Sequence, residues 1–426
     1  MTGSSRSRVR WSVGALLFAS SVINYIDRQT LSALAPILKA EFHWTNSDFA
    51  SLLIAFRVAY TIMQGAGGWL FDRLGSRIAF PLVVSCYSLV AMATTFAQGL
   101  VSFRIFRFLL GMGEGPNFPG AAKTVAEWFP SRERGWAVAL FDSGTSIGGA
   151  VAPFIVLYAY KLFGTWRPPF ALTGCLGIVW VLVWLRFYRA PGSNPRVSPA
   201  ELDYIREGRP ASAQTQPAAR WRDLLRYRQA WGIILGRFLL DPFWFFVSEW
   251  FALYLFSRGF HLTESVLGFW MPFVGADLGN FVGGGLSSYW ISRGWPVGKA
   301  RRRVLLIFGP SMASLLLVLH ASSYFAALLL FAYASFAYAA CSTMFLSLPT
   351  DVFQPRAVGT VAGMAGTGAG IGTMISTYWI GRVTDVTTFA PVIAVAAIVP
   401  CAATAVFLTL VRSSKKPDPR GLLLEF

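Results

Sequence analysis

Charged side chains are scarce in this sequence. They make up 13% of its 426 residues, whereas soluble proteins average about 25%. Hydrophobic residues reach 55% before any of the 40 glycines is counted. This balance excludes an ordinary soluble enzyme. The 36 Phe, 16 Trp and 14 Tyr also exclude a disordered chain, because disordered segments contain few aromatic residues.

Cysteine and histidine are scarce too. The four cysteines lie inside apolar stretches, which predicts small buried hydrophobic residues and excludes a disulfide scaffold. The three histidines form no Cys/His cluster with metal-binding spacing. No P-loop occurs, so nothing indicates an ATP-driven pump. We find no catalytic constellation, and we expect neither an enzyme nor a bound cofactor or metal.

Long apolar runs fill most of the chain. A helix needs about 20 mainly apolar residues to cross a bilayer, and irregular backbone cannot face lipid. We therefore expect an all-α membrane protein with twelve transmembrane helices. The spans predicted by hydropathy are 13–37, 47–70, 78–98, 105–127, 135–160, 168–189, 230–256, 266–291, 304–321, 325–348, 358–381 and 388–411.

The distribution of Lys and Arg predicts the orientation. Six of the 37 lie in loops on one side and five within spans, which leaves 26 on the other side. Because cytoplasmic loops are enriched in Lys and Arg, we expect both termini in the cytoplasm and a bacterial-type inner membrane around the spans. The net charge of +17 is then a matter of topology, and we expect the lipid bilayer rather than nucleic acid as partner.

A polar segment divides the chain into two six-span halves. It predicts an N-terminal bundle at 1–189, a cytoplasmic linker at 190–229, and a C-terminal bundle with a short tail at 230–426. Within the linker, Ser198 and Glu201 fit a capping box, which predicts a short surface helix over 199–207.

The two halves contain a repeat with a constant offset of 224 residues. Arg132, Gly135, Ser143-Gly144 and Gly148 recur as Arg356, Gly359, Thr367-Gly368 and Gly372. Parallel six-span halves place a substrate site between them near the middle of the membrane. We also interpret Thr145 and Thr367 as equivalent positions of the repeat that line this site.

The loop between spans 2 and 3 carries a compact motif. It reads Gly67-Gly-Trp-Leu-Phe-Asp72-Arg73-Leu-Gly75-Ser-Arg77 and resembles the loop 2–3 signature of the major facilitator superfamily. The resemblance implies the two-bundle fold and a gating role for Gly68, Asp72, Arg73, Gly75 and Arg77. Topological positive charge alone explains the arginines but neither the aspartate nor the glycines.

Three further motifs resemble the anion:cation symporter family, which carries organic anions. They are Asn24-Tyr25-Ile-Asp27-Arg28-Gln29, Ala59-Tyr60-Thr-Ile-Met-Gln64, and Arg107 followed seven residues later by Glu114. Within that family the chain is most similar to bacterial hexuronate transporters. The stretches that carry this similarity are Glu127-Trp-Phe-Pro-Ser-Arg132-Glu-Arg134, Arg228-Gln-Ala-Trp231-Gly and Arg237-Phe-Leu-Leu-Asp241-Pro242-Phe-Trp244.

Asp27 and Arg28 lie past the middle of span 1. A charge at the centre of a span costs roughly 2.5–3.5 kcal/mol on insertion scales, so such residues are functional hypotheses by default. Neighbours on a helix point about 100° apart, so one is expected to bind substrate and the other to exchange a proton. The resemblance assigns the proton to Asp27 and the substrate carboxylate to Arg28, with Tyr25 available for a sugar hydroxyl. The alternative is a structural ion pair with span 4.

Arg107 and Glu114 are two turns apart on span 4 and share a face. Burial and a nearby cation act oppositely on the protonation of a carboxyl group, which suits a proton carrier. The resemblance gives Glu114 the proton and Arg107 its modulation. A purely structural pair is the alternative, and the neighbouring glycines are explained by close helix contact alone.

Several polar residues of other spans are candidates for substrate binding. Tyr60 and Gln64 are neutral groups one turn apart on span 2, or else a packed aromatic with a satisfied amide. Arg57 departs from the hexuronate pattern, and either provides an extra cation or reaches the outer interface. In the second half the candidates are Arg237, Asp241, Trp244 and Asn280. Arg237 and Asp241 have the i,i+4 spacing of an ion pair, which is either structural or part of the site.

Together these features predict a secondary transporter that imports an organic anion, a hexuronate or related sugar acid, by proton symport with alternating access. We expect a monomer whose coupling ion is H⁺. The alternatives are an antiporter or exporter of other organic anions or drugs, and a membrane sensor with the same fold that does not transport.

Overall fold

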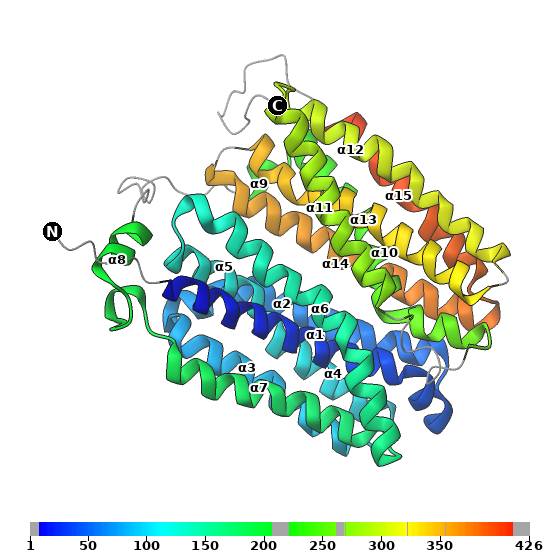
Figure 1. Ribbon diagram of the computed structural model, residues 1–426. Helices are drawn as coiled ribbons and strands as arrows, with labels where there is room; N and C mark the ends of the chain where they lie inside the picture. The colour runs from blue at the N-terminus through cyan, green and yellow to red at the C-terminus, as the bar shows by residue number, and fades with distance from the viewer. Residues whose placement is uncertain are drawn as a thin grey trace. The chain divides into compact units, whose positions relative to one another are not determined.

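The computed structural model describes residues 8–206, 221–260, 268, 270–321, 323–353 and 355–411. Helices dominate this part of the chain, which confirms the predicted all-α class (Figure 1). Eight of the helices found there are long and apolar enough to cross a membrane. The chain divides into two compact units, with the change from one to the other between the helices α8 and α9.

The first unit contains the helices up to α8. Their bounds are α1 (Val9–Phe42), α2 (Asn46–Leu74), α3 (Ser76–Ala93), η1 (Thr94–Phe96), α4 (Leu100–Glu114), α5 (Asn117–Trp128), α6 (Ser131–Phe163), α7 (Arg167–Phe187), η2 (Pro191–Ser193) and α8 (Pro199–Arg206). Within this unit α1 packs along α6 and α3 packs along α7 (Figure 1). Only Thr45–Ala50, which comprise the residue before α2 and the first residues of that helix, group with the second unit.

The second unit contains the remaining helices. Their bounds are α9 (Trp221–Leu224), α10 (Arg228–Ser257), α11 (Met271–Ser292), α12 (Val297–Ser311), η4 (Met312–His320), α13 (Tyr324–Val352), α14 (Pro355–Val386) and α15 (Ala390–Leu410). The pairing of α10 with α14 matches that of α1 with α6, and α15 packs against α12 and η4 as α7 packs against α3.

Each predicted span falls on a helix, but the predicted ends are wrong in several places. Span 4 is not one helix, because α4 ends at Glu114 and α5 begins at Asn117. Pro116, whose ring nitrogen cannot donate a hydrogen bond, lies at this break. Span 9 begins earlier than predicted, since the polar residues from Val297 onward are already helical. Hydropathy finds the apolar middle of a helix but not its polar ends.

The repeated glycines make equivalent contacts in the two units. A Cβ on Gly144 or Gly148 of α6 would meet the carbonyl oxygens of Phe18 and Val22 in α1. A Cβ on Gly372 of α14 would likewise meet the carbonyl oxygen of Phe238 in α10, at 2.2 Å. Glycine therefore lets the two backbones of each pair approach closely.

This register corrects one prediction about the repeat. Because Gly144 corresponds to Gly368, Thr367 is equivalent to Ser143, and Thr145 is not its counterpart. The Thr145 hydroxyl donates to the Asp142 carbonyl and the Thr367 hydroxyl to the Gly363 carbonyl. Both hydroxyls are thus bonded to the backbone of their own helix.

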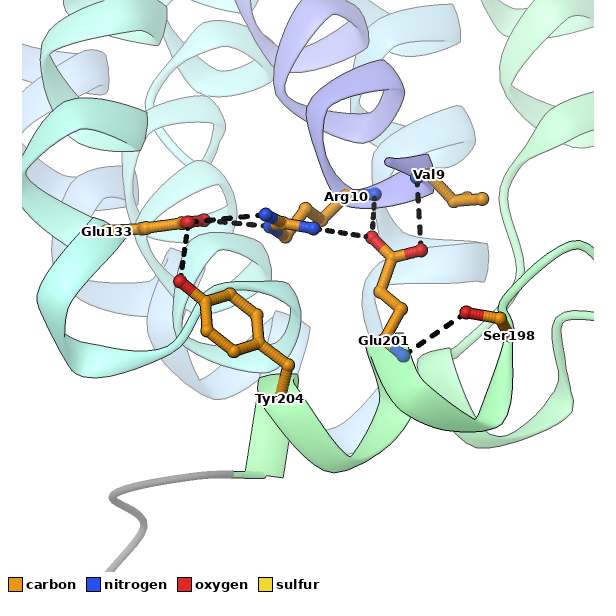
Figure 2. Close-up of polar contacts among 6 residues, drawn as sticks. All are labelled: Val9, Arg10, Glu133, Ser198, Glu201 and Tyr204. Carbon is orange, nitrogen blue, oxygen red and sulfur yellow. Dashed lines mark hydrogen bonds and ion pairs between the residues drawn. The ribbon is translucent and has the colours of Figure 1, made fainter. Parts of the chain in front are cut away.

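The linker helix α8 is fastened to the first unit by buried charges (Figure 2). The backbone N–H of Glu201 donates to Ser198 Oγ, as the capping box predicts. The Glu201 carboxylate accepts the N–H groups of Val9 and Arg10 at the start of α1, and the Arg10 guanidinium at 2.9 Å. Arg10 also pairs with Glu133 at 2.7 Å. Glu201 of α8 therefore caps a second helix, α1.

Two cysteines differ from the sequence prediction. Cys341 is buried and Cys401 partly buried, but Cys86 and Cys175 are exposed on α3 and α7. Apolar sequence surroundings do not distinguish the interior of a bundle from an outer face that meets lipid, which is why the prediction of burial was wrong for these two.

Candidate functional site

An ion pair in the first unit joins α1 to α4. Arg28 Nη2 donates to Glu114 Oε2 at 2.9 Å, and Arg28 Nε donates to the same oxygen at 3.2 Å. Arg28 is 4% exposed and Glu114 0%. Asn24, one turn before Arg28, accepts a longer hydrogen bond from the guanidinium. Glu114 thus forms an ion pair with Arg28 across two helices.

Aromatic rings surround the Arg28 guanidinium. Its central carbon lies 4.8 Å from the ring centre of Tyr25, 4.9 Å from that of Phe56 and 4.8 Å from that of Tyr60. A guanidinium over an aromatic face is stabilised by about 2 kcal/mol or more when desolvated. These rings hold the guanidinium in place without neutralising its charge.

The glycines of α4 explain how this cluster is assembled. A Cβ on Gly111 would lie 2.2 Å from the Phe56 carbonyl oxygen, and one on Gly115 would lie 2.8 Å from the Tyr60 carbonyl oxygen. The backbones of α4 and α2 therefore touch at the level of the two rings. Close helix contact, which the sequence left as an alternative, is what these glycines provide.

Asp27 has a neighbour on a different helix from that of Arg28. Its carboxyl group interacts with the Thr173 hydroxyl on α7, and neither carboxyl oxygen makes a short hydrogen bond within the described part of the chain. Asp27 is 2% exposed. The two neighbouring charges of span 1 thus face different helices, as the 100° rotation between adjacent residues requires.

Tyr87 on α3 is a residue that the sequence analysis missed. It is fully buried, interacts electrostatically with Asp27 and Glu114, and its backbone is close to Gly113 of α4. In the described residues its hydroxyl has no hydrogen-bond partner. In the sequence, only the hydroxyl group of a tyrosine within an apolar run indicates that Tyr87 lies near the buried carboxyl groups. The same pattern is also expected of a tyrosine that only packs in the core.

Two further arginines of the first unit are buried. Arg107 is 2% exposed, stacks on Phe56 at 4.6 Å and acts electrostatically on Glu114. Arg57 is 4% exposed and within electrostatic range of Tyr25. Both therefore add positive charge to the region around Glu114 and Tyr25, and Arg57 lies inside the protein.

Tyr60 and Gln64 behave as the one-turn spacing predicts. Gln64 Nε2 donates to Tyr60 Oη at 3.4 Å. Tyr60 is half-buried and Gln64 is exposed. The amide therefore continues the polar face of α2 beyond the aromatic cluster.

The candidates of the second unit form two separate polar contacts. Arg237 Nη2 donates to Asp241 Oδ2 at 2.6 Å, within one turn of α10. Asn280 Oδ1 of α11 accepts a hydrogen bond from the Thr343 hydroxyl at 2.8 Å. Trp244 stacks on Tyr338 with 7° between the ring planes, so this indole packs within its own unit.

The predicted gating motif lies where α2 ends and α3 begins. Arg73 and Arg77 are exposed, and Gly75 has a φ of +72°, which glycine adopts without strain. The side-chain positions at Gly68 and Asp72 lie outside the described part. Gly75 and Arg77 help line a cavity of about 310 Å³, beside which Tyr188 donates to Glu127 at 3.1 Å. Burial raises the pKa of the Tyr188 hydroxyl.

The family description of the Major Facilitator Superfamily matches residues 17–377. The chain belongs to the major facilitator superfamily. The resemblance of the loop 2–3 motif is thereby confirmed, and this family member is a transporter and a multi-pass membrane protein.

Curated relatives confirm the resemblance to bacterial sugar-acid transporters. The hexuronate transporter of Escherichia coli (strain K12) is 32% identical over 399 residues, which cover 92% of this chain and 91% of the relative. The galacturonate transporter of Dickeya chrysanthemi is 36% identical over 280 residues, which cover 65% of this chain and 81% of the relative.

Solved structures of two other transporters share the fold. The inward open structure of the xylose transporter XylE from E. coli has a TM-score of 0.70 and 14% identity, covering 97% of this chain and 98% of that one. A bacterial homologue of the human lysosomal transporter Spinster has a TM-score of 0.69 and 18% identity, covering 95% and 96%. These likenesses confirm the predicted major facilitator fold.

Proposed function

We propose that this transporter imports a sugar-acid anion, a hexuronate or related compound, together with protons and by alternating access. The observation that carries the proposal is the buried Arg28, a guanidinium surrounded by three rings and held by one carboxylate. A fork of donors of this kind matches a carboxylate substrate. The names of the relatives support the sugar-acid class.

The Arg28–Glu114 pair provides the coupling step. A substrate carboxylate and the Glu114 carboxylate compete for the same guanidinium. Protonation of Glu114 removes its charge and so frees Arg28 for the substrate. Arg107 lies on the same helix as Glu114 and acts on it electrostatically. As a cation it opposes protonation of Glu114 when it is near, and it favours protonation when it moves away. Asp27 holds a second proton on the α7 side of span 1.

Protons are needed for an electrical reason. Moving one negative charge into a cell against a negative interior is opposed by about 2.3 kcal/mol per 100 mV. Two protons carried with a monoanion reverse the sign of this term. Two buried carboxyl groups of the first unit, Asp27 and Glu114, supply that number of proton sites.

The test is uptake of labelled galacturonate and glucuronate into proteoliposomes with the purified full-length protein. We expect accumulation driven by an inward proton gradient and abolished by a protonophore. Unlabelled uronates and galactonate should compete, and uncharged galactose should not. Uptake driven by an outward gradient of another anion, with no response to the protonophore, would instead identify an antiporter.

Arg28→Ala tests the carboxylate site directly. We expect binding of galacturonate to fall at least tenfold, while binding of an uncharged sugar analogue changes little. Arg104→Ala is a matched control, because Arg104 is a partly exposed arginine of α4 that donates to the Ser51 hydroxyl at 2.7 Å. Equal losses for both ligands in Arg28→Ala would indicate a folding defect and contradict the proposed role.

A further inference from the structure

The junction of α11 and α12 carries a cluster of cations stacked on aromatic rings. Arg293 lies 5.0 Å from the ring centre of Tyr289, and Lys299 lies 4.5 Å from that of Trp295. Arg303 lies 5.5 Å from the ring centre of Trp290 and 5.2 Å from that of Trp295. The members of this junction cluster are Tyr289, Trp290, Arg293, Trp295, Lys299 and Arg303.

The aromatic half of the cluster is a single platform. The rings of Trp290 and Trp295 are stacked, with centres 5.6 Å apart and 18° between their planes. Tyr289 is 52% exposed, and both tryptophans are partly exposed. The platform therefore holds its cations at the surface of the second unit and not in its interior.

In the described part of the chain, no carboxylate forms an ion pair with the three cations. The sequence contains no Asp or Glu between Asp277 and Asp351, and no ion pair joins Arg293, Lys299 or Arg303 to an acid in the described residues. Arg301, their neighbour, does pair with Asp351, at 2.9 Å. Among the described residues, Asp351 thus pairs with the inner Arg301, and the three outer cations are available to another anion.

The position of the cluster identifies that anion. The cluster lies at the start of an apolar segment, Val297–His320, that is long enough to cross a membrane. Tryptophan and tyrosine favour the level of the lipid headgroups, and basic residues at the end of a span attract acidic lipids. We propose that the junction cluster binds the phosphodiester headgroup of an acidic phospholipid, with the phosphate between Arg293, Lys299 and Arg303.

The enrichment of Lys and Arg in cytoplasmic loops would explain the three cations by itself, but it does not explain the aromatic rings stacked against them. The rings orient the guanidinium and ammonium groups, and cation–π contacts hold them in place before a lipid arrives. A lipid-binding site therefore requires both the three cations and the aromatic platform, and a separate variant tests each of them.

The experiment is native mass spectrometry of the full-length protein in equal amounts of phosphatidylglycerol and phosphatidylethanolamine. We expect the wild type to retain phosphatidylglycerol preferentially. The variant Arg293→Gln/Lys299→Gln/Arg303→Gln should lose this preference by more than tenfold, since each such cation contributes about fivefold to binding. The matched control Arg189→Gln/Arg226→Gln/Arg228→Gln removes three exposed arginines elsewhere and should keep the preference.

A second variant, Trp290→Leu/Trp295→Leu, keeps every charge and removes the platform. We expect its phosphatidylglycerol binding to fall about threefold or more. The proposal is overturned if the charge variant binds like the wild type, if the control loses as much as the charge variant, or if the tryptophan variant is unaffected. None of these readouts depends on transport, so they stand apart from the uptake experiments.

Discussion

At Arg28, one guanidinium is stabilised by two different kinds of neighbour. The rings of Tyr25, Phe56 and Tyr60 attract the positive charge without a charge of their own, whereas Glu114 is a full anion. Removing one partner of a buried ion pair destabilises a protein by about 3–5 kcal/mol. The rings leave Arg28 with favourable contacts even when Glu114 is neutral, so the arginine does not depend on the carboxylate alone.

Glu114→Gln separates proton coupling from substrate exchange. The amide resembles the protonated carboxyl group and carries no charge, so Arg28 stays available to a substrate carboxylate while no proton is taken up at this position. We expect proton-driven accumulation to disappear and counterflow of labelled galacturonate to persist in part. Full proton-coupled uptake by this variant would remove Glu114 from the mechanism.

Tyr87→Phe tests the hydroxyl beside the two buried carboxyl groups. Removing one oxygen changes a neighbour of Asp27 and Glu114 while the ring and its contact with Gly113 remain. We expect the pH dependence of uptake to move by up to about one pH unit, because the hydroxyl dipole lies within electrostatic range of both carboxyl groups, while counterflow at the optimum is preserved. Ser88→Ala is the control, because Ser88 is also buried but faces Gly177 of α7. Identical pH profiles for Tyr87→Phe and wild type would reduce Tyr87 to a packing residue.

The sequence predicted which residues of the site are charged and offered an ion pair between spans 1 and 4 as an alternative, but it did not predict the geometry of that contact. Helix spacing puts Arg107 and Glu114 on one face, whereas the ion pair of Glu114 with Arg28 joins two helices through residues 86 positions apart in the sequence. Such a contact depends on how two helices are rotated about their axes, which local periodicity does not determine. Tyr87 was missed because a lone tyrosine in an apolar run has the same pattern whether it packs or bonds.

At the scale of helices, each span predicted by hydropathy falls on a helix. The glycines mark where the backbones of two helices are in close contact. The offset of 224 residues predicted a repeat, and the matching contacts of Gly148 and Gly372 give it a structural meaning. The ends of helices were harder to predict. A polar stretch such as that beginning at Val297 remains helical because long basic side chains reach water from a helix end.

Gly372→Ala tests the crossing of α14 and α10. The added Cβ would lie 2.2 Å from the Phe238 carbonyl oxygen, and overpacking of this kind costs about 1–3 kcal/mol. We expect a lower melting temperature of the detergent-purified protein. Gly363→Ala, on the same helix with nothing within 4 Å of its Cβ, should raise or keep the melting temperature, because alanine favours a helix. Equal effects of the two substitutions would contradict the close crossing.

Glu201→Gln tests how α8 is fastened. The neutral amide weakens bonds from Val9, Arg10 and the Arg10 guanidinium, and hydrogen bonds to a charged group contribute about 1.5–3 kcal/mol each. We expect faster hydrogen exchange over residues 199–206. Asp203→Asn changes an exposed acid on the same helix and should leave the exchange unaltered. A protected α8 in Glu201→Gln would show that apolar packing alone holds it.

For the whole molecule, the sequence predicts an orientation that follows from the uneven distribution of Lys and Arg. We expect green fluorescent protein fused after the last residue to fluoresce and alkaline phosphatase fused there to be inactive. Phosphatase fused after Gly164, in the turn between α6 and α7, should be active. The opposite pattern would invert the assignment of cytoplasmic loops.

The repeated helix crossings have a consequence for synthesis. Each unit contains its own close crossing of the repeat, α1 with α6 in the first and α10 with α14 in the second. Domains generally fold as units, the N-terminal one first, while the chain is still on the ribosome. Arg28 and Glu114 lie on α1 and α4, so they can form their ion pair before the later helices leave the ribosome. Two charged groups that are costly to place in lipid are then paired early in synthesis.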